Sequence, residues 1–140
     1  MENAVKMPAK GAVYGISRTV DMSYEQAVDK IKETLKGQGF GVLTEIDVKT
    51  TLKQKIDQDF TKYVILGACN PHLAYKAFSE ELEIGLLLPC NVCVYEQPGS
   101  GETVVAVVDP GVMLGVTGRD DLGPVADEAR KKLQAALDAL

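Results

Sequence analysis

Two short segments of this sequence hold the residue types best suited to chemistry. The segment CNPH, which starts at position 69, contains a thiol, a carboxamide and the single histidine of the chain, and the segment PCN, which starts at position 89, contains a second thiol and carboxamide. Cysteine and histidine are the ligands that soft and borderline metals prefer, and two neighbouring thiols can also cycle through a disulfide. The candidate ligand-binding residues are Cys69, Asn70, His72, Cys90 and Asn91.

Structural roles explain the same residues and compete with these functions. Free cysteines are among the most buried residues in proteins, so Cys69 and Cys90 are expected to be structural thiols more often than ligands or nucleophiles. Asparagine side chains next to a helix or turn commonly cap it. The cysteine spacing matches no zinc signature, and no base–nucleophile–orienter arrangement can be built from one histidine and three cysteines. Cys93 completes a CxxC pattern with Cys90, but residues three apart in a strand point to opposite faces, so it is expected to be a small hydrophobe.

The two segments meet only if the strands that carry them are neighbours. Residues 61–70 are apolar on both alternating faces, which predicts a strand inside a sheet. Residues 91–96 and 103–108 form two further predicted strands, joined by a hairpin turn at 98–101. If the first two of these strands are antiparallel neighbours, the end of one lies beside the start of the other, and the CNPH and PCN segments face each other at one edge of the sheet.

Capping residues and apolar periodicity predict the remaining helices and strands. Ser23 and Gln26 form a capping-box pattern before a stripe of apolar residues that ends at two glycines. Asp47 is positioned to cap a short helix with Val48, Leu52 and Ile56 as its buried stripe. Glu45 and Asp47 are also a weak candidate for a divalent cation. The other expectations are strands over residues 12–20 and 40–46, a short helix over 71–82, a loop over 112–118, and a last helix capped by Asp120 or Asp121 with Pro124 in its first turn.

Composition indicates one ordinary globular domain over residues 1–140, with residues 1–11 as a loose lead-in. Hydrophobic residues make up 46% of the chain and charged residues 25%. A formal charge of −5 argues against a nucleic-acid or anionic-lipid partner. No apolar run is long enough to cross a bilayer and no signal peptide is evident, so the expected location is the cytoplasm. A homodimer is expected because symmetric dimers are the commonest assembly of small domains.

Longer segments identify a family resemblance. ILGACNPHLAYKAF (65–78), GLLLPCNV (85–92), GFGVLTEIDVKTTLKQKI (39–56) and VDPGVML (108–114) resemble the bacterial and archaeal "domain of unknown function 302" family. The resemblance implies an α+β fold of the TATA-binding-protein-like class: an antiparallel sheet with helices packed on one face and core order β-α-β-β-β-β-α, here with extra short helices. It implies no activity, cofactor or enzyme class, because the family has none established.

Three functions remain for the sequence, in order of preference. The first is a small cytoplasmic module that binds a small molecule or a metal around the CNP and PCN segments. The second is a structural or interaction protein that acts as a homodimer. The third is a thiol-based redox protein that uses Cys69 or Cys90 as a reactive thiolate, which requires a lowered pKa and partial exposure. An enzyme is the least favoured of the three, and the sequence identifies neither cofactor nor metal.

Overall fold

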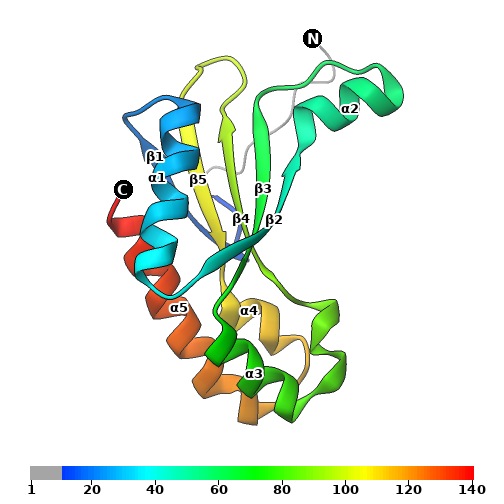
Figure 1. The fold of residues 1–140 in the computed structure, drawn as a ribbon, viewed down its shortest axis with the longest axis vertical. Helices are drawn as coiled ribbons and strands as arrows, with labels where there is room; N and C mark the ends of the chain where they lie inside the picture. Colours follow the sequence, from blue (N-terminus) through cyan, green and yellow to red (C-terminus); the bar gives the residue numbers. More distant parts are fainter. Residues whose placement is uncertain (1–10) are drawn as a thin grey trace.

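The computed structural model describes residues 11–140, so the predicted lead-in lies almost wholly outside the described residues. These residues form a five-stranded antiparallel sheet with strand order β1-β5-β4-β3-β2 (Figure 1). The strands are β1 Gly15–Val20, β2 Gly41–Asp47, β3 Tyr63–Cys69, β4 Cys90–Glu96 and β5 Thr103–Val108. The helices are α1 Tyr24–Gly37, α2 Val48–Ile56, α3 Pro71–Glu80, α4 Pro110–Gly115 and α5 Gly123–Asp138, with 3-10 segments η1 Leu82–Leu86 and η2 Asp120–Leu122.

The predicted fold class is confirmed. Without α2, α3 and α4 the element order is β-α-β-β-β-β-α, and the long helices α1 and α5 pack on one face of the sheet (Figure 1). That face is buried because alternate residues of the inner strands are apolar, and they pack against the apolar stripes of the two helices. The main hydrophobic core includes Ile31, Leu35, Leu66, Val92, Val94, Val105, Val107, Leu133 and Leu137.

Local capping explains where the helices begin. The Ser23 hydroxyl accepts a hydrogen bond from the Gln26 backbone N–H, and the Gln26 side chain accepts one from the Ser23 N–H, so the predicted capping box is present. Asp47 accepts from the Thr50 N–H at 2.9 Å and caps α2, as predicted. Glu45 instead forms an ion pair with Lys32 at 2.9 Å, so these two carboxylates serve separate local contacts.

Three sequence expectations are wrong in detail. The stripe of α2 is not buried: Ile56 is 61% exposed, because this helix projects from the end of β2 and β3 and packs on little else (Figure 1). Residues 110–115 form α4, which overlaps the loop predicted over 112–118, and Asp109 caps this helix by accepting from the Gly111 N–H at 2.9 Å. The last helix begins at Gly123 without a side-chain cap, because Asp120 and Asp121 belong to η2.

A second, smaller hydrophobic core lies beyond the end of the sheet. It is formed by α3, η1, α4, η2 and the first turns of α5. We call these segments together the lower lobe (Figure 1). Its buried residues are Ala77, Ile84, Leu114, Leu122 and Ala126. Helix α5 contributes Ala126 to this second core and Leu133 to the main core, so one helix joins the two.

Candidate ligand-binding cavity

An apolar cavity of about 250 Å³ lies where the two cores meet. Its walls come from the ends of β3 and β4, from α3, α4 and α5, and from η1 and the segment that follows it. The lining residues are Phe40, Leu43, Ala68, Cys69, Asn70, Leu73, Ala74, Ala77, Phe78, Gly85, Leu88, Pro89, Cys90, Pro110, Met113, Leu114, Val125 and Ala129. Asn70 is the one residue in this set with a hydrogen-bonding amide side chain, so the cavity offers apolar contact and little else.

The structure brings three of the five predicted site residues to this cavity. Cys69, Asn70 and Cys90 line it, because β3 and β4 are antiparallel neighbours with Ala68 opposite Cys90. His72 and Asn91 do not line it, and both side chains are exposed. Asn91 follows Cys90 in β4 and therefore points to the opposite face of the sheet. The predicted convergence of the CNP and PCN segments is thus present, but without the histidine and the second carboxamide.

The two cavity thiols are in surroundings that disfavour the thiolate. Burial, with a smaller contribution from the neighbouring Cys69, raises the pKa of Cys90 to about 11. Burial also raises the pKa of Cys69. Both residues are free cysteines. A thiol whose pKa is raised is protonated at neutral pH and is a poor nucleophile, so this environment is typical of structural cysteines.

Asn70 has a structural role at the cavity wall. Its side-chain oxygen accepts a hydrogen bond from the Leu73 N–H at 3.2 Å and caps α3, and its amide donates to the Gln38 carbonyl at 3.5 Å. Gly39 has φ of +81°, and a Cβ there would lie 3.0 Å from the Asn70 amide nitrogen. The buried amide therefore joins the end of α1 to the start of α3, which confirms the capping interpretation.

The described residues offer no metal site around these cysteines. Within residues 11–140, His, Cys, Asp and Glu side chains nowhere gather in a group of three or more that could hold a metal ion. Cys93 lies opposite Ile65 on the other face of the sheet from Cys90, and its thiol hydrogen-bonds with the Tyr63 hydroxyl. The CxxC pattern therefore does not form a chelating pair, as the strand alternation predicts.

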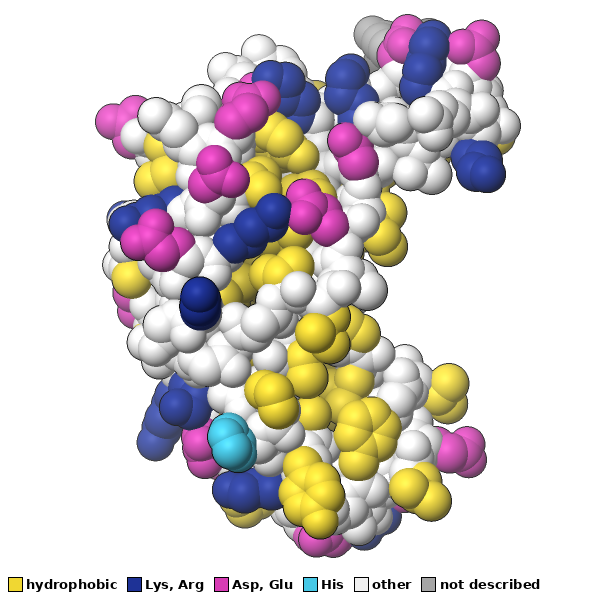
Figure 2. All heavy atoms as spheres, viewed as in Figure 1, with side chains coloured by type: hydrophobic (Ala, Val, Ile, Leu, Met, Phe, Trp, Pro, Cys, Tyr) yellow, Lys and Arg dark blue, Asp and Glu magenta, His cyan; other side chains and the backbone are white. Residues whose placement is uncertain are grey.

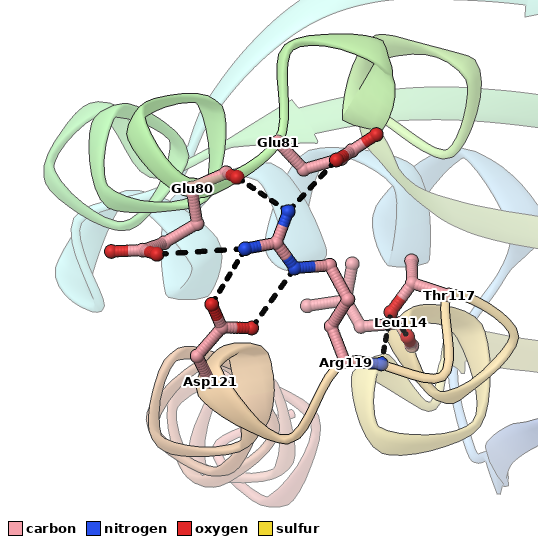
Figure 3. A network of polar contacts seen from close by, with 6 residues as sticks. All are labelled: Glu80, Glu81, Leu114, Thr117, Arg119 and Asp121. Atoms are coloured by element: carbon pink, nitrogen blue, oxygen red, sulfur yellow. Dashed lines mark hydrogen bonds and ion pairs between the residues drawn. The ribbon is translucent and has the colours of Figure 1, made fainter.

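A network of hydrogen bonds and ion pairs around one arginine connects the segments of the lower lobe. Arg119, between α4 and η2, donates to the Glu80 carbonyl at 2.6 Å and forms ion pairs with Glu81 at 2.9 Å and Asp121 at 2.7 Å (Figure 3). These contacts hold the pKa of the Asp121 carboxyl below its usual range and raise that of Arg119. The network connects the end of α3 to η2, so it fixes the two sides of the lobe against each other.

The mouth of the cavity is lined with exposed apolar side chains. Leu43 is 68% exposed and Phe78 is 40% exposed, and Figure 2 shows hydrophobic side chains gathered over this end of the molecule. Neither these residues nor Met113 and Leu114 of α4 were among the site residues predicted from the sequence. The one sequence signal was the apolar run at residues 84–88, which is too short and irregular to indicate a cavity wall.

These features define a single α+β unit with a small apolar cavity at the junction of two cores. The chain belongs to the family described as "Domain of unknown function DUF302", whose model matches residues 16–140. It is similar to the crystal structure of an uncharacterized conserved DUF302 protein from Bacillus stearothermophilus, with 31% sequence identity and a TM-score of 0.84, over 91% of this chain and 98% of that one. A comparison with the curated proteins found no match. Among residues 11–140, no helix is long and apolar enough to cross a membrane.

Proposed function

We propose that the protein is a binding module for a small apolar molecule held in the cavity beside Cys69, Asn70 and Cys90. The observation that carries this proposal is a cavity of about 250 Å³ whose lining is almost entirely apolar. An apolar guest that enters this pocket removes its apolar walls from water, which favours binding. The exposed apolar mouth provides an entrance for such a guest.

The volume limits the size of the ligand. An engineered cavity of about 150 Å³ accepts benzene, whereas pockets for drug-sized ligands begin at about 300 Å³. A cavity of about 250 Å³ lies between them and holds about ten non-hydrogen atoms by proportion. The fitting ligands are therefore a single aromatic ring with a short substituent or a medium-length alkyl chain.

The expected affinity is modest. Burying ten apolar carbons contributes about 8 kcal/mol at about 0.8 kcal/mol each, and association costs at least about 4 kcal/mol. The difference is at most about 4 kcal/mol, which corresponds to a Kd of about 1 mM or weaker. The assay must therefore be carried out at high ligand concentration.

The same geometry favours an apolar ligand over a bound metal ion and over a thiol-based redox function. The metal interpretation would require further ligands, and neither His72 nor Asn91 reaches the cavity. The redox interpretation would require a lowered thiol pKa, and burial raises the pKa of both cavity cysteines. We place the protein in the cytoplasm, which suits its free cysteines.

The test is a titration with indole and with 1-octanol, followed by methyl NMR of the full chain. Met113 and Leu114 line the cavity, so the proposal predicts saturable chemical-shift changes of their methyl signals. It predicts no such change for the methyl signals of Val20, which lies outside the cavity. The Ala74→Phe variant places a ring in the cavity and should abolish these shifts. Its matched control, Ala135→Phe, makes the same change at a half-buried alanine of α5 outside the cavity and should bind normally. Binding unchanged in Ala74→Phe, or shifts spread evenly over the molecule, would contradict the proposal.

A further inference from the structure

Helix α2 and the residues that flank it form an arm that projects from the body of the molecule. The arm, residues 47–60, lies at the opposite end of the molecule from the lower lobe, and the surface is hollowed between the two (Figures 1 and 2). Val48, Leu52 and Ile56 recur every fourth residue along α2 and form the apolar stripe of an amphipathic helix. None of the three is buried, and Ile56 is 61% exposed. The described residues therefore leave this stripe partly uncovered.

The lower lobe also exposes apolar side chains. Leu82 and Leu86 of η1 are 85% and 83% exposed, and the exposed Tyr75 and Phe78 of α3 precede them in the chain. Figure 2 shows hydrophobic side chains gathered over this end of the molecule. Leu82 and Leu86 are not among the residues that line the cavity, so a partner that covers them leaves the cavity free. Exposed apolar patches of this kind mark interaction surfaces.

The negative charge of the chain is concentrated in the region of the lower lobe. Residues 71–90 and 109–130 contain eight carboxylates and three lysine or arginine side chains, so their net charge is −5, the same as that of the whole chain. Glu83, which lies between the two exposed leucines in sequence, is exposed and has no ion-pair partner among the described residues. This charge repels a second lower lobe, a nucleic acid or an anionic lipid, and it attracts an apolar segment that carries a free cation.

The arm supplies such a segment. Helix α2 contains three lysines and no carboxylate, and the aspartates on either side of it make the arm as a whole neutral. Two of the lysines are held within the arm: Lys53 pairs with two aspartates at 2.9 and 3.3 Å, and Lys49 donates to a backbone carbonyl at 2.9 Å. Lys55 has no ion-pair partner among the described residues. It immediately precedes Ile56, so the end of α2 combines an exposed apolar side chain with an unpaired cation.

We propose that α2 of each copy of this chain docks on the lower lobe of a second copy, so that the protein is a reciprocal two-fold homodimer. One chain cannot bring its own arm and lobe together, because they lie at opposite ends of the molecule (Figure 1). A second copy, turned by half a turn in the plane of Figure 1 and placed beside the hollow, brings its arm to this lobe and its lobe to this arm. Ile56 then packs against Leu82 and Leu86 of the second copy, and Lys55 pairs with Glu83.

The area of this contact is sufficient for a weak dimer. The nine residues of α2 give a helix about 14 Å long and about 10 Å wide, and half of its accessible surface is about 270 Å². Two arms and the two lobe surfaces that they cover therefore bury about 1,100 Å². Specific interfaces begin at about 1,000 Å². We therefore expect a dimer that dissociates on dilution.

Sedimentation equilibrium on the full chain, from about 10 μM to about 1 mM, tests this inference. The mass should rise with concentration from 15.1 kDa toward twice that value and stop there, because the reciprocal contact closes. Ile56→Lys and Leu86→Lys change exposed side chains that the single chain does not need for folding. Each should raise the dimer dissociation constant about 100-fold, because the dimer loses the apolar contact twice. Ala139→Lys, at an exposed position near the end of α5, adds the same charge and should leave the dimer unchanged.

Charge reversal tests the pairing of Lys55 with Glu83. Lys55→Glu and Glu83→Lys each bring like charges together twice in the dimer, so each alone should raise the dissociation constant about tenfold. The chain with both substitutions should regain the wild-type value. Glu83→Lys also makes the chain less acidic, so general repulsion alone predicts a tighter dimer and the pairing predicts a weaker one. Lys131→Glu, at an exposed position of α5, is the control for Lys55→Glu.

Circular dichroism establishes that each variant is folded before its mass is interpreted. A wild-type protein that stays monomeric at about 1 mM overturns the inference, whether Leu82 and Leu86 then bind a phosphatidylcholine vesicle or another protein. A dimer that Ile56→Lys and Leu86→Lys both leave unchanged overturns it as well, because the dimer then uses another surface. Assemblies that keep growing beyond two chains contradict the reciprocal arrangement. A double charge reversal no tighter than the single ones contradicts the docking of Lys55 beside Glu83.

Discussion

Cys90 makes the stability of the protein sensitive to alkaline pH. Burial raises the pKa of its thiol from an ordinary value of 9.0 to about 11 in the folded state, where the residue is only 7% exposed. An acid whose folded pKa is raised favours folding while it is protonated. Its contribution is therefore complete below pH 9, is lost as the pH rises through the folded pKa, and is gone above about pH 11.

The size of the effect follows from the two pKa values. The full difference of about two pKa units corresponds to about 3 kcal/mol. At pH 10, where an unfolded thiol is mostly ionised and the folded one is mostly protonated, about half of this contribution has been lost. Tyr24, whose pKa burial raises to about 12, adds to the loss in the same direction. A comparison between variants is needed to isolate the cysteine.

The assay is urea unfolding of the wild type and Cys90→Ala at pH 7 and pH 10, with a reductant present. The variant is expected to be less stable at pH 7, because it loses a buried sulfur. Between the two pH values, however, the wild type should lose about 1 kcal/mol more stability than the variant. Equal losses in the two proteins would show that Cys90 ionises as easily in the folded state as in the unfolded one, and the argument for a protonated cavity thiol would be wrong.

Three further substitutions test the architecture around the cavity. Gly67→Ala should cost about 1–3 kcal/mol in urea unfolding, because a Cβ there overlaps the Thr44 side chain and lies 2.8 Å from the Pro89 ring. Gly41→Ala meets nothing within 4 Å and is its control. Asn70→Ala should cost about 1–2 kcal/mol through loss of the α3 cap, and Asn70→Asp should recover most of it. Arg119→Gln should speed amide hydrogen exchange at the end of α3 and in η2, and leave the sheet unchanged.

Each of these tests has an outcome that contradicts its premise. If Gly67→Ala costs no more than Gly41→Ala, Thr44 and Pro89 do not pack closely against Gly67. An Asn70→Asp variant as unstable as Asn70→Ala would mean that capping is not the main role of the amide. Exchange that accelerates equally in the sheet and in the lower lobe of Arg119→Gln would show that the arginine stabilises the whole fold rather than the lobe.

Local signals predicted most of the fold because each was short-range and unambiguous. The capping box at Ser23, the cap at Asp47 and the sequence of β5 correspond to the observed element limits within a residue. Helix α4 escaped prediction because it has only six residues, contains Gly111 and ends at Gly115, so no helical periodicity develops. The last helix lost its predicted cap because the aspartates take part in a separate 3-10 turn.

The candidate site was predicted only in part, and the reason differs from the one that applies to the helices. Adjacency in sequence suggested that Cys90 and Asn91 act together, whereas strand alternation separates them onto opposite faces of the sheet. The cavity itself depends on how η1 and α4 pack against the end of the sheet, and no local pattern encodes that packing.

The position of the cavity between two cores has a thermodynamic consequence. Small regions of a protein open at lower free energy than the whole molecule, and the lower lobe, with its own small core and the ion pairs centred on Arg119, is such a region. A guest in the cavity contacts both cores and is lost when the lobe opens. By mass action, ligand at 100 times its Kd would raise the free energy of this opening by about 2.7 kcal/mol. Occupancy of the cavity would thus appear as slower amide hydrogen exchange in the lower lobe, at one end of the molecule.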